Sequence, residues 1–186
     1  MTRLSHWIAL ACSLCALGVP ATAAGQSSPA LARDVGTIEG IVRAYYEVIS
    51  GPPGAPREWG RDSTLYMPGA RFVALKQRAG KPVANLMTPE EFRRAVDREF
   101  VAKGFFETEI GHRIERFGHV AQVRSVYETR RTADGPLLGR GVNYLLLYWD
   151  GTRWWITGAV WDDERPENPL PNSWIEPGRA KAPRSP

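Results

Sequence analysis

Cysteine and histidine are scarce in this sequence, and their positions exclude several kinds of chemistry. The 186 residues include two cysteines, Cys12 and Cys15, and three histidines, of which only His112 and His119 lie beyond residue 24. Without other thiols, the rest of the chain can form neither a disulfide framework nor a cysteine-based zinc site or nucleophile. A chain of this length that is 43% hydrophobic is expected to form one globular domain.

Long hydrophobic runs are also missing, and the one apolar run lies at the N-terminus. It extends from Trp7 to Val19, follows Arg3 and precedes the small residues of 21–24. Such a run is too short to cross a bilayer core of about 30 Å, and its flanks are typical of a secretory signal peptide. Neither cysteine ends the run with leucine three positions before it, as a lipoprotein signal requires. We therefore expect residues 1–24 to be cleaved and the protein to be periplasmic or secreted, without a membrane span.

The charge is small and dispersed. The formal net charge is +4, and removal of residues 1–24 takes away Arg3 but no acidic residue, which leaves +3. A scattered charge of this size does not predict a nucleic-acid partner. The sequence also has no Gly-x-Gly-x-x-Gly motif, no phosphate-binding loop and no metal-ligand spacing, so we predict neither a cofactor nor a metal site.

Helix signals occur in three segments of the N-terminal half. After a small, polar linker at 25–36, apolar residues recur with helical spacing from Ile38 to Ile49, and Gly51 with the prolines after it ends that helix. A short helix is expected at 57–66. The third helix begins at the capping box Thr88-Pro89-Glu90-Glu91 and ends at Gly104.

Strand signals dominate the second half. Alternation with period two predicts strands at 105–117, 120–132, 138–149 and 153–162, after an earlier short strand at 72–75. The order predicts an α+β domain over 37–162, in which three N-terminal helices pack on a strongly curved antiparallel sheet. Residues 163–186 contain six of the 15 prolines and are expected to form an extended tail.

Two segments resemble a known superfamily. The first segment is Trp59 followed by the run from Tyr66 to Phe72, and the second is the run Trp149-Asp150-Gly151-Thr152-Arg153-Trp154-Trp155-Ile156. Both are similar to the nuclear transport factor 2-like superfamily, which includes SnoaL-like proteins and ketosteroid isomerase. The resemblance covers about 37–161. It implies a cystatin-like cone with a pocket between the helices and the concave sheet, and a homodimer. It implies no particular activity, because the superfamily holds enzymes and non-catalytic binding proteins.

The strand register predicts which residues face that pocket. A two-residue turn at Gly118-His119 pairs His112 with Ser125 and Ile110 with Tyr127, and it places Glu107 and Glu109 on the solvated face. Apolar walls with a few polar groups are typical of a small-molecule site. The predicted ligand-binding residues are Tyr45, Trp59, Ile110, His112, Ser125, Tyr127 and Asn143.

Two functions remain open. The protein binds a small apolar or amphipathic molecule without catalysis, or it is an isomerase or dehydratase with His112 as general base and Tyr127 or Tyr45 as donor to an oxyanion. Against the second, a buried His112 satisfied by Ser125 alone would have no catalytic role, and no carboxylate falls on the predicted concave face of the central strands to complete a dyad. Asp162 at the mouth of the last strand, or Asp62 in the second helix, could supply one.

The opposite face of the sheet carries an aromatic patch, which predicts a homodimer interface. The predicted interface residues are Tyr144, Leu146, Tyr148, Trp155 and Trp161. The alternative is that the C-terminal tail folds back over this patch through Trp174.

Overall fold

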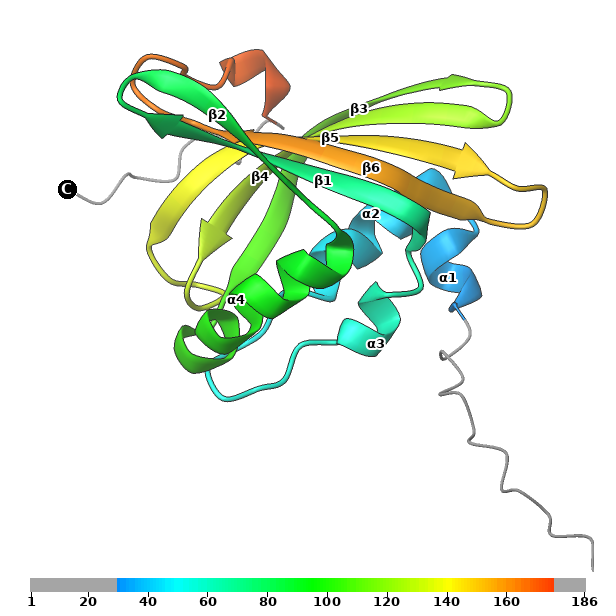
Figure 1. The fold of residues 1–186 in the computed structure, drawn as a ribbon, viewed down its shortest axis with the longest axis horizontal. Coiled ribbons are helices and arrows are strands. Elements are labelled where there is room, and N and C mark those ends of the chain that lie inside the picture. The colour runs from blue at the N-terminus through cyan, green and yellow to red at the C-terminus, as the bar shows by residue number, and fades with distance from the viewer. Residues whose placement is uncertain (1–29, 176–186) are drawn as a thin grey trace, which may run out of the picture.

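The computed structural model describes residues 30–175, so the predicted signal peptide and the start of the predicted linker lie outside the described residues. A curved sheet forms one layer, and the α-helices cover one of its faces (Figure 1). The elements are α1 (Ala32–Val35), α2 (Ile38–Glu47), α3 (Trp59–Asp62), β1 (Tyr66–Arg78), β2 (Lys81–Met87), α4 (Pro89–Lys103), β3 (Phe106–Phe117), β4 (Val120–Arg130), β5 (Leu137–Trp149), β6 (Trp154–Asp163) and the short 3-10 helix η1 (Asn172–Trp174).

The sheet has six strands in the order β2-β1-β6-β5-β4-β3. All neighbours are antiparallel except β1 and β6, which are parallel. The predicted α+β class and the four-stranded meander are therefore confirmed. The short strand expected at 72–75 is the middle of the longer β1, whose hairpin with β2 was not predicted. No helix within residues 30–175 is long and apolar enough to cross a bilayer.

Local sequence signals explain where the two longer helices begin. The Thr37 side chain accepts a hydrogen bond from the Gly40 amide at the start of α2. At α4 both bonds of the predicted capping box are present, since Thr88 accepts from the Glu91 amide and Glu91 accepts from the Thr88 amide. Each cap satisfies backbone amides that the first turn of a helix leaves without partners. α2 then buries its apolar face against the sheet. α4 packs less closely, since none of its residues is fully buried.

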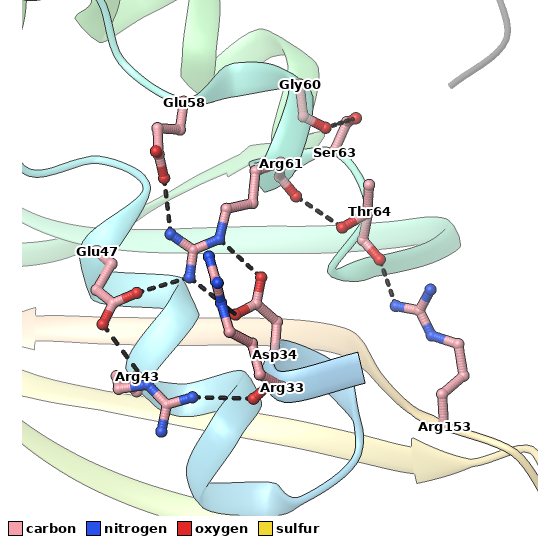
Figure 2. A network of polar contacts seen from close by, with 10 residues as sticks. All are labelled: Arg33, Asp34, Arg43, Glu47, Glu58, Gly60, Arg61, Ser63, Thr64 and Arg153. Atoms are coloured by element: carbon pink, nitrogen blue, oxygen red, sulfur yellow. Dashed lines mark hydrogen bonds and ion pairs between the residues drawn. The ribbon is translucent and has the colours of Figure 1, made fainter. Parts of the chain in front are cut away.

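The described part of the predicted linker is folded, which corrects that boundary. Asp34 in α1 is fully buried and accepts two hydrogen bonds from the Arg61 guanidinium, at 2.7 and 2.8 Å. Figure 2 shows that Arg61 of α3 also reaches Glu47 at the end of α2 and Glu58. One guanidinium thus ties α1, α2 and α3 together, and the Arg61 hydrogen bonds lower the pKa of Asp34.

β3 and β6 each contain a β-bulge. In β3, Glu109 pairs with Tyr127 and Gly111 pairs with Val126, so Ile110 is an extra residue. In β6, Gly158 pairs with Leu146 and Ile156 with Leu147, so Thr157 is extra. Because side chains alternate between faces, one extra residue moves every side chain on the far side of the bulge to the opposite face.

The C-terminal segment packs on the convex face, away from the α-helices (Figure 1). Ile175 is buried there in a cluster with Ile110 and Val126, and the Arg124 guanidinium lies 3.8 Å from the centre of the Trp174 ring. The folded domain therefore continues past the predicted end at residue 162 as far as Ile175. The tail covers the convex side of β3 and β4.

Candidate functional site

A cavity of about 450 Å³ lies between the helices and the concave face of the sheet. Its walls come from α2, α4 and strands β1, β3, β4, β5 and β6, so segments distant in the sequence meet there. The aromatic wall residues are Tyr45, Tyr66, Phe72, Phe92, Phe100, Phe105, Tyr127 and Trp161. The polar wall residues are Glu107, Thr129, Arg140, Asn143, Asp163 and Glu164. The combination of apolar walls with a few polar groups is typical of a ligand site.

The β3 bulge turns Glu107 toward the cavity. Glu107 precedes the bulged Ile110 and pairs with Thr129, which places the Glu107 side chain on the concave face. Its Oε1 accepts a hydrogen bond from Asn143 Nδ2 at 3.2 Å. Burial raises the pKa of Glu107 to about 8, with a further contribution from the negative charge of Asp163, while the Asn143 hydrogen bond opposes this shift. A carboxyl group with such a pKa is mostly protonated at neutral pH.

The β6 bulge has the same effect on Trp161 and Asp163. Trp161 pairs with Asn143 and Asp163 pairs with Gly141, so both side chains share the concave face. The Tyr127 hydroxyl donates a 2.6 Å hydrogen bond to Asp163 Oδ1. Burial raises the pKa of Tyr127, so its hydroxyl stays protonated and remains a donor.

A buried hydrogen-bond network lies directly behind the cavity wall. The hydroxyls of Tyr46 and Ser125 are 2.6 Å apart, and Ser125 donates to Glu109. The other carboxylate oxygen of Glu109 lies 3.1 Å from His112 Nδ1. Asn143 connects this network to the cavity, because its Nδ2 also donates to the Tyr46 hydroxyl at 3.2 Å.

Three of the seven predicted ligand-binding residues line the cavity, namely Tyr45, Tyr127 and Asn143. The other four are placed elsewhere. Ile110 is the bulged residue and packs on the convex side under Ile175. Ser125 is fully buried in the network behind the wall. Trp59 Nε1 donates to Asp97 at 2.6 Å, outside the cavity wall.

His112 does not line the cavity, which corrects the predicted position of the general base. Its pairing with Ser125 is as predicted, but its side chain is 37% exposed and contacts Glu109. The cavity ends before this part of β3. The paired carboxylate that the sequence did not predict is therefore present, but at Glu109 and outside the cavity.

Sequence reasoning missed Glu107, Trp161 and Asp163 because it assumed uninterrupted strand pairing. A glycine within a strand often marks a bulge, and Gly111 and Gly158 each follow a bulged residue. This signal was present in both strands. Within residues 30–175 no three histidine, cysteine, aspartate or glutamate side chains cluster as a metal site would require.

The convex aromatic patch is smaller than predicted. Tyr144, Leu146 and Tyr148 are 37%, 51% and 38% exposed, and Val160 of the neighbouring strand is 40% exposed. Trp161 is excluded because it lines the cavity. Trp155 Nε1 donates to Asp150 at 2.6 Å, and the Arg153 guanidinium stacks on the Trp155 ring.

Comparisons with known proteins found similar solved structures. No protein-family model and no curated protein matches the sequence. Among solved structures, a protein of unknown function from Mycobacterium tuberculosis is 18% identical with a TM-score of 0.50, over 71% of this chain and 73% of that chain. An NTF2-like protein of unknown function from Silicibacter pomeroyi is 15% identical with a TM-score of 0.47, over 69% and 94%. One from Methylobacillus flagellatus is 16% identical with a TM-score of 0.46, over 69% and 92%. At these identities the likeness to these structures, two of which are NTF2-like, concerns the fold alone.

Proposed function

We propose that the protein binds a small amphipathic molecule in the cavity and has no catalytic activity of its own. The observation that carries this proposal is the wall composition, in which eight aromatic side chains surround a polar region formed by Glu107, Asn143 and Asp163. A volume of about 450 Å³ is within the range of small-molecule sites. Aromatic walls supply apolar contact, and the polar region orients one end of the ligand.

A variant that fills the cavity tests this proposal. Gly139 pairs with Thr129 on the concave face, and a β-carbon there would meet only the Thr129 hydroxyl at 3.6 Å, an ordinary contact. Gly139→Trp should therefore occupy the cavity without backbone strain. Leu86→Trp is the matched control, because Leu86 is exposed on β2 outside the cavity.

The measurement is a fluorescence titration with the neutral apolar probe N-phenyl-1-naphthylamine. We expect the wild-type protein and Leu86→Trp to bind the probe with equal affinity and Gly139→Trp to bind at least tenfold more weakly. Failure of the wild-type protein to bind the probe, or equal binding by Gly139→Trp with its native circular dichroism spectrum, would contradict the proposal.

A second candidate function is an isomerase or dehydratase, and Glu107 rather than His112 would then be the base. The observation that favours it is a cavity carboxyl whose pKa is raised to about 8 by burial, near the value that suits a general base at neutral pH. A β,γ-unsaturated cyclic ketone, followed by its ultraviolet absorbance, tests this function. Conversion to the conjugated ketone by the wild-type protein and by His112→Ala, but not by Glu107→Gln, would establish this function.

We also propose that the protein is exported and that residues 1–24 are removed. The support is the sequence pattern of Arg3, the apolar run 7–19 and the small residues 21–24. Fractionation of a bacterial host and intact mass measurement test this proposal. We expect the periplasmic or secreted chain to begin after Ala24, whereas an unprocessed chain in the cytoplasm would contradict it.

Homodimerisation through the convex face is a further part of the proposal. Its support is the exposed apolar patch formed by Tyr144, Leu146, Tyr148 and Val160, here called the convex patch. Exposed apolar patches on a soluble domain are typical of interaction surfaces. The described part of the C-terminal tail contacts Ile110 of β3 and Val126 of β4, whereas the convex patch lies on β5 and β6.

A further inference from the structure

We propose that the ligand is an organic ammonium ion, held by Glu107 and Asp163 and enclosed by the aromatic walls of the cavity. This inference rests on the proposed binding function and specifies its ligand class. It is derived from three independent features of the cavity: the balance of charge, one unpartnered hydroxyl, and the chemistry of the walls.

The charge balance of the cavity is negative. Four charged side chains line it, and two of them, Arg140 and Glu164, form an ion pair at 3.0 Å. Among the described residues, no basic side chain lies within 4 Å of the carboxyl oxygens of Glu107 or Asp163. Arg165 is close to Asp163, but its guanidinium binds Asp162 at 2.6 Å and Glu167 at 3.1 Å. A positive ligand would therefore balance the cavity.

Both carboxyl groups keep capacity for a ligand. Glu107 accepts one hydrogen bond from Asn143, and Asp163 accepts one from Tyr127. A carboxylate can accept about four hydrogen bonds, and leaving it enclosed without a partner is unfavourable. In the empty cavity, protonation of Glu107 relieves part of this cost. An ammonium group would relieve it instead, because it supplies three donors and the opposite charge.

Tyr45 provides the second feature. Its side chain lines the cavity and is 8% exposed, and its hydroxyl has no hydrogen-bond partner within residues 30–175. The side chain is enclosed while its hydroxyl opens on the cavity, so a ligand there can supply the missing partner. Burial raises the pKa of Tyr45, which keeps the hydroxyl neutral and able to accept an N–H.

The aromatic walls are the third feature. The faces of tyrosine and tryptophan rings attract cations, most strongly where water is excluded. Tyr66, Tyr127 and Trp161 line the same cavity as the two carboxyl groups. A neutral ligand would use these walls only for apolar contact, whereas an ammonium ion would use both the walls and the carboxylates.

Protonation of Glu107 gives the proposal a distinctive pH dependence. Four titratable groups interact electrostatically with Glu107, namely Tyr45 and Tyr46 of α2, Tyr127 of β4 and Asp163 of β6. Arg140 and Glu164 line the same cavity, and the α4 residues that line it are phenylalanines. An ammonium ion binds the ionised carboxylate. With the pKa of Glu107 at about 8, its affinity should rise up to about tenfold per pH unit between pH 6 and 8.

Calorimetric titration with three probes that share a 2-(1-naphthyl)ethyl group and differ in their polar end tests the inference. The probes are 2-(1-naphthyl)ethylammonium, 2-(1-naphthyl)ethanol and 3-(1-naphthyl)propanoate. At pH 8 we expect the ammonium ion to bind at least tenfold more tightly than the alcohol and the carboxylate to bind most weakly. Lowering the pH to 6 should reduce the affinity for the ammonium ion at least tenfold and change the affinity for the alcohol by less than twofold.

Two variants and one control assign the effect to the cavity carboxyl groups. Glu107→Gln can still accept from Asn143, and Asp163→Asn can still accept from Tyr127, so either variant keeps the existing hydrogen bond. Both should lose most of the preference for the ammonium ion, and Glu107→Gln should also lose the pH dependence. Glu115→Gln, at an exposed position of the same strand, should behave as the wild-type protein.

The outcomes separate this inference from the proposed function. If the alcohol binds as tightly as the ammonium ion, or if Glu107→Gln and Asp163→Asn both keep the preference, the ammonium inference is wrong while ligand binding stands. Absence of measurable ammonium binding also overturns it. Failure of the wild-type protein to bind the neutral N-phenyl-1-naphthylamine contradicts the proposed function itself.

Discussion

Asn143 joins Glu107 in the cavity wall to Tyr46 in the network behind it, through two 3.2 Å hydrogen bonds from the same amide nitrogen. The amide therefore uses one N–H for each partner and holds Glu107 in place. It donates to Glu107 but brings no positive charge. The cavity carboxyl is consequently fixed in position and has no basic partner among the described residues.

The raised pKa of Glu107 should make the protein less stable as the pH rises. The folded protein holds the Glu107 proton up to about pH 8, whereas an unfolded glutamate loses it near pH 4.3. In that interval the folded state binds more protons, so the free energy of unfolding should fall by up to about 1.4 kcal/mol per pH unit. Urea unfolding of the wild-type protein and Glu107→Gln at pH 5, 7 and 9 measures this slope.

Glu107→Gln should have the flatter profile and should be the more stable protein at pH 9. Burial also raises the pKa of Asp62, so both proteins share that contribution and only their difference reports on Glu107. Parallel pH profiles for the two proteins would show that Glu107 is ionised in the folded state.

The ion pair between Asp34 and Arg61 should be essential for stability. Arg61→Met removes the close partner of the fully buried Asp34 and leaves it only the exposed Arg33 guanidinium at 3.7 Å; breaking a buried pair in this way typically costs about 3–5 kcal/mol. Adding Asp34→Asn to that variant should recover part of the loss. Urea unfolding measures all three proteins. Arg43→Met is the control, since Arg43 forms an exposed ion pair with Glu47 at 3.5 Å and should cost about 1 kcal/mol or less. A small effect of Arg61→Met would mean that α1 does not pack on α3.

Ile110→Ala distinguishes the two faces of the sheet. Ile110 is fully buried against Ile175 on the convex side, so truncation should destabilise the protein by about 2–4 kcal/mol. The affinity for N-phenyl-1-naphthylamine should stay within twofold, because Ile110 does not line the cavity. Leu86→Ala, at an exposed position, should change stability by less than about 0.5 kcal/mol. A weakened affinity without loss of stability would instead place Ile110 in the cavity wall.

Leu146→Glu tests the convex patch. The wild-type protein should sediment as a dimer at micromolar concentration, and a charge at the centre of the patch should produce a monomer with unchanged circular dichroism. Leu86→Glu adds the same charge on β2, outside the patch, and should remain dimeric. A monomeric wild-type protein would refute dimerisation through this face.

Features that depend on neighbouring residues were predictable from the sequence. The capping box at Thr88 starts α4, and Gly118-His119 forms the turn that pairs Phe117 with Val120 and His112 with Ser125. Features that depend on distant residues were not. The pairing of Asp34 with Arg61 joins residues 27 positions apart, and nothing in the local sequence of 25–36 indicates it. Residues 32–35 of the predicted linker are helical for that reason.

The sequence alone determined α2, α3, α4 and the meander from β3 to β6, because caps, turns and the period-two alternation are local properties. It also determined that the cavity would combine aromatic and polar groups, as Tyr45, Tyr127 and Asn143 show. Only the tertiary structure decided which carboxyl groups enter the cavity. Alternation specifies two faces but not where one residue is skipped, and a single bulge exchanges them. At Ile110 that choice depends on the returning tail, since Ile175 packs on it and a β-carbon on Gly111 would collide with the Trp174 carbonyl.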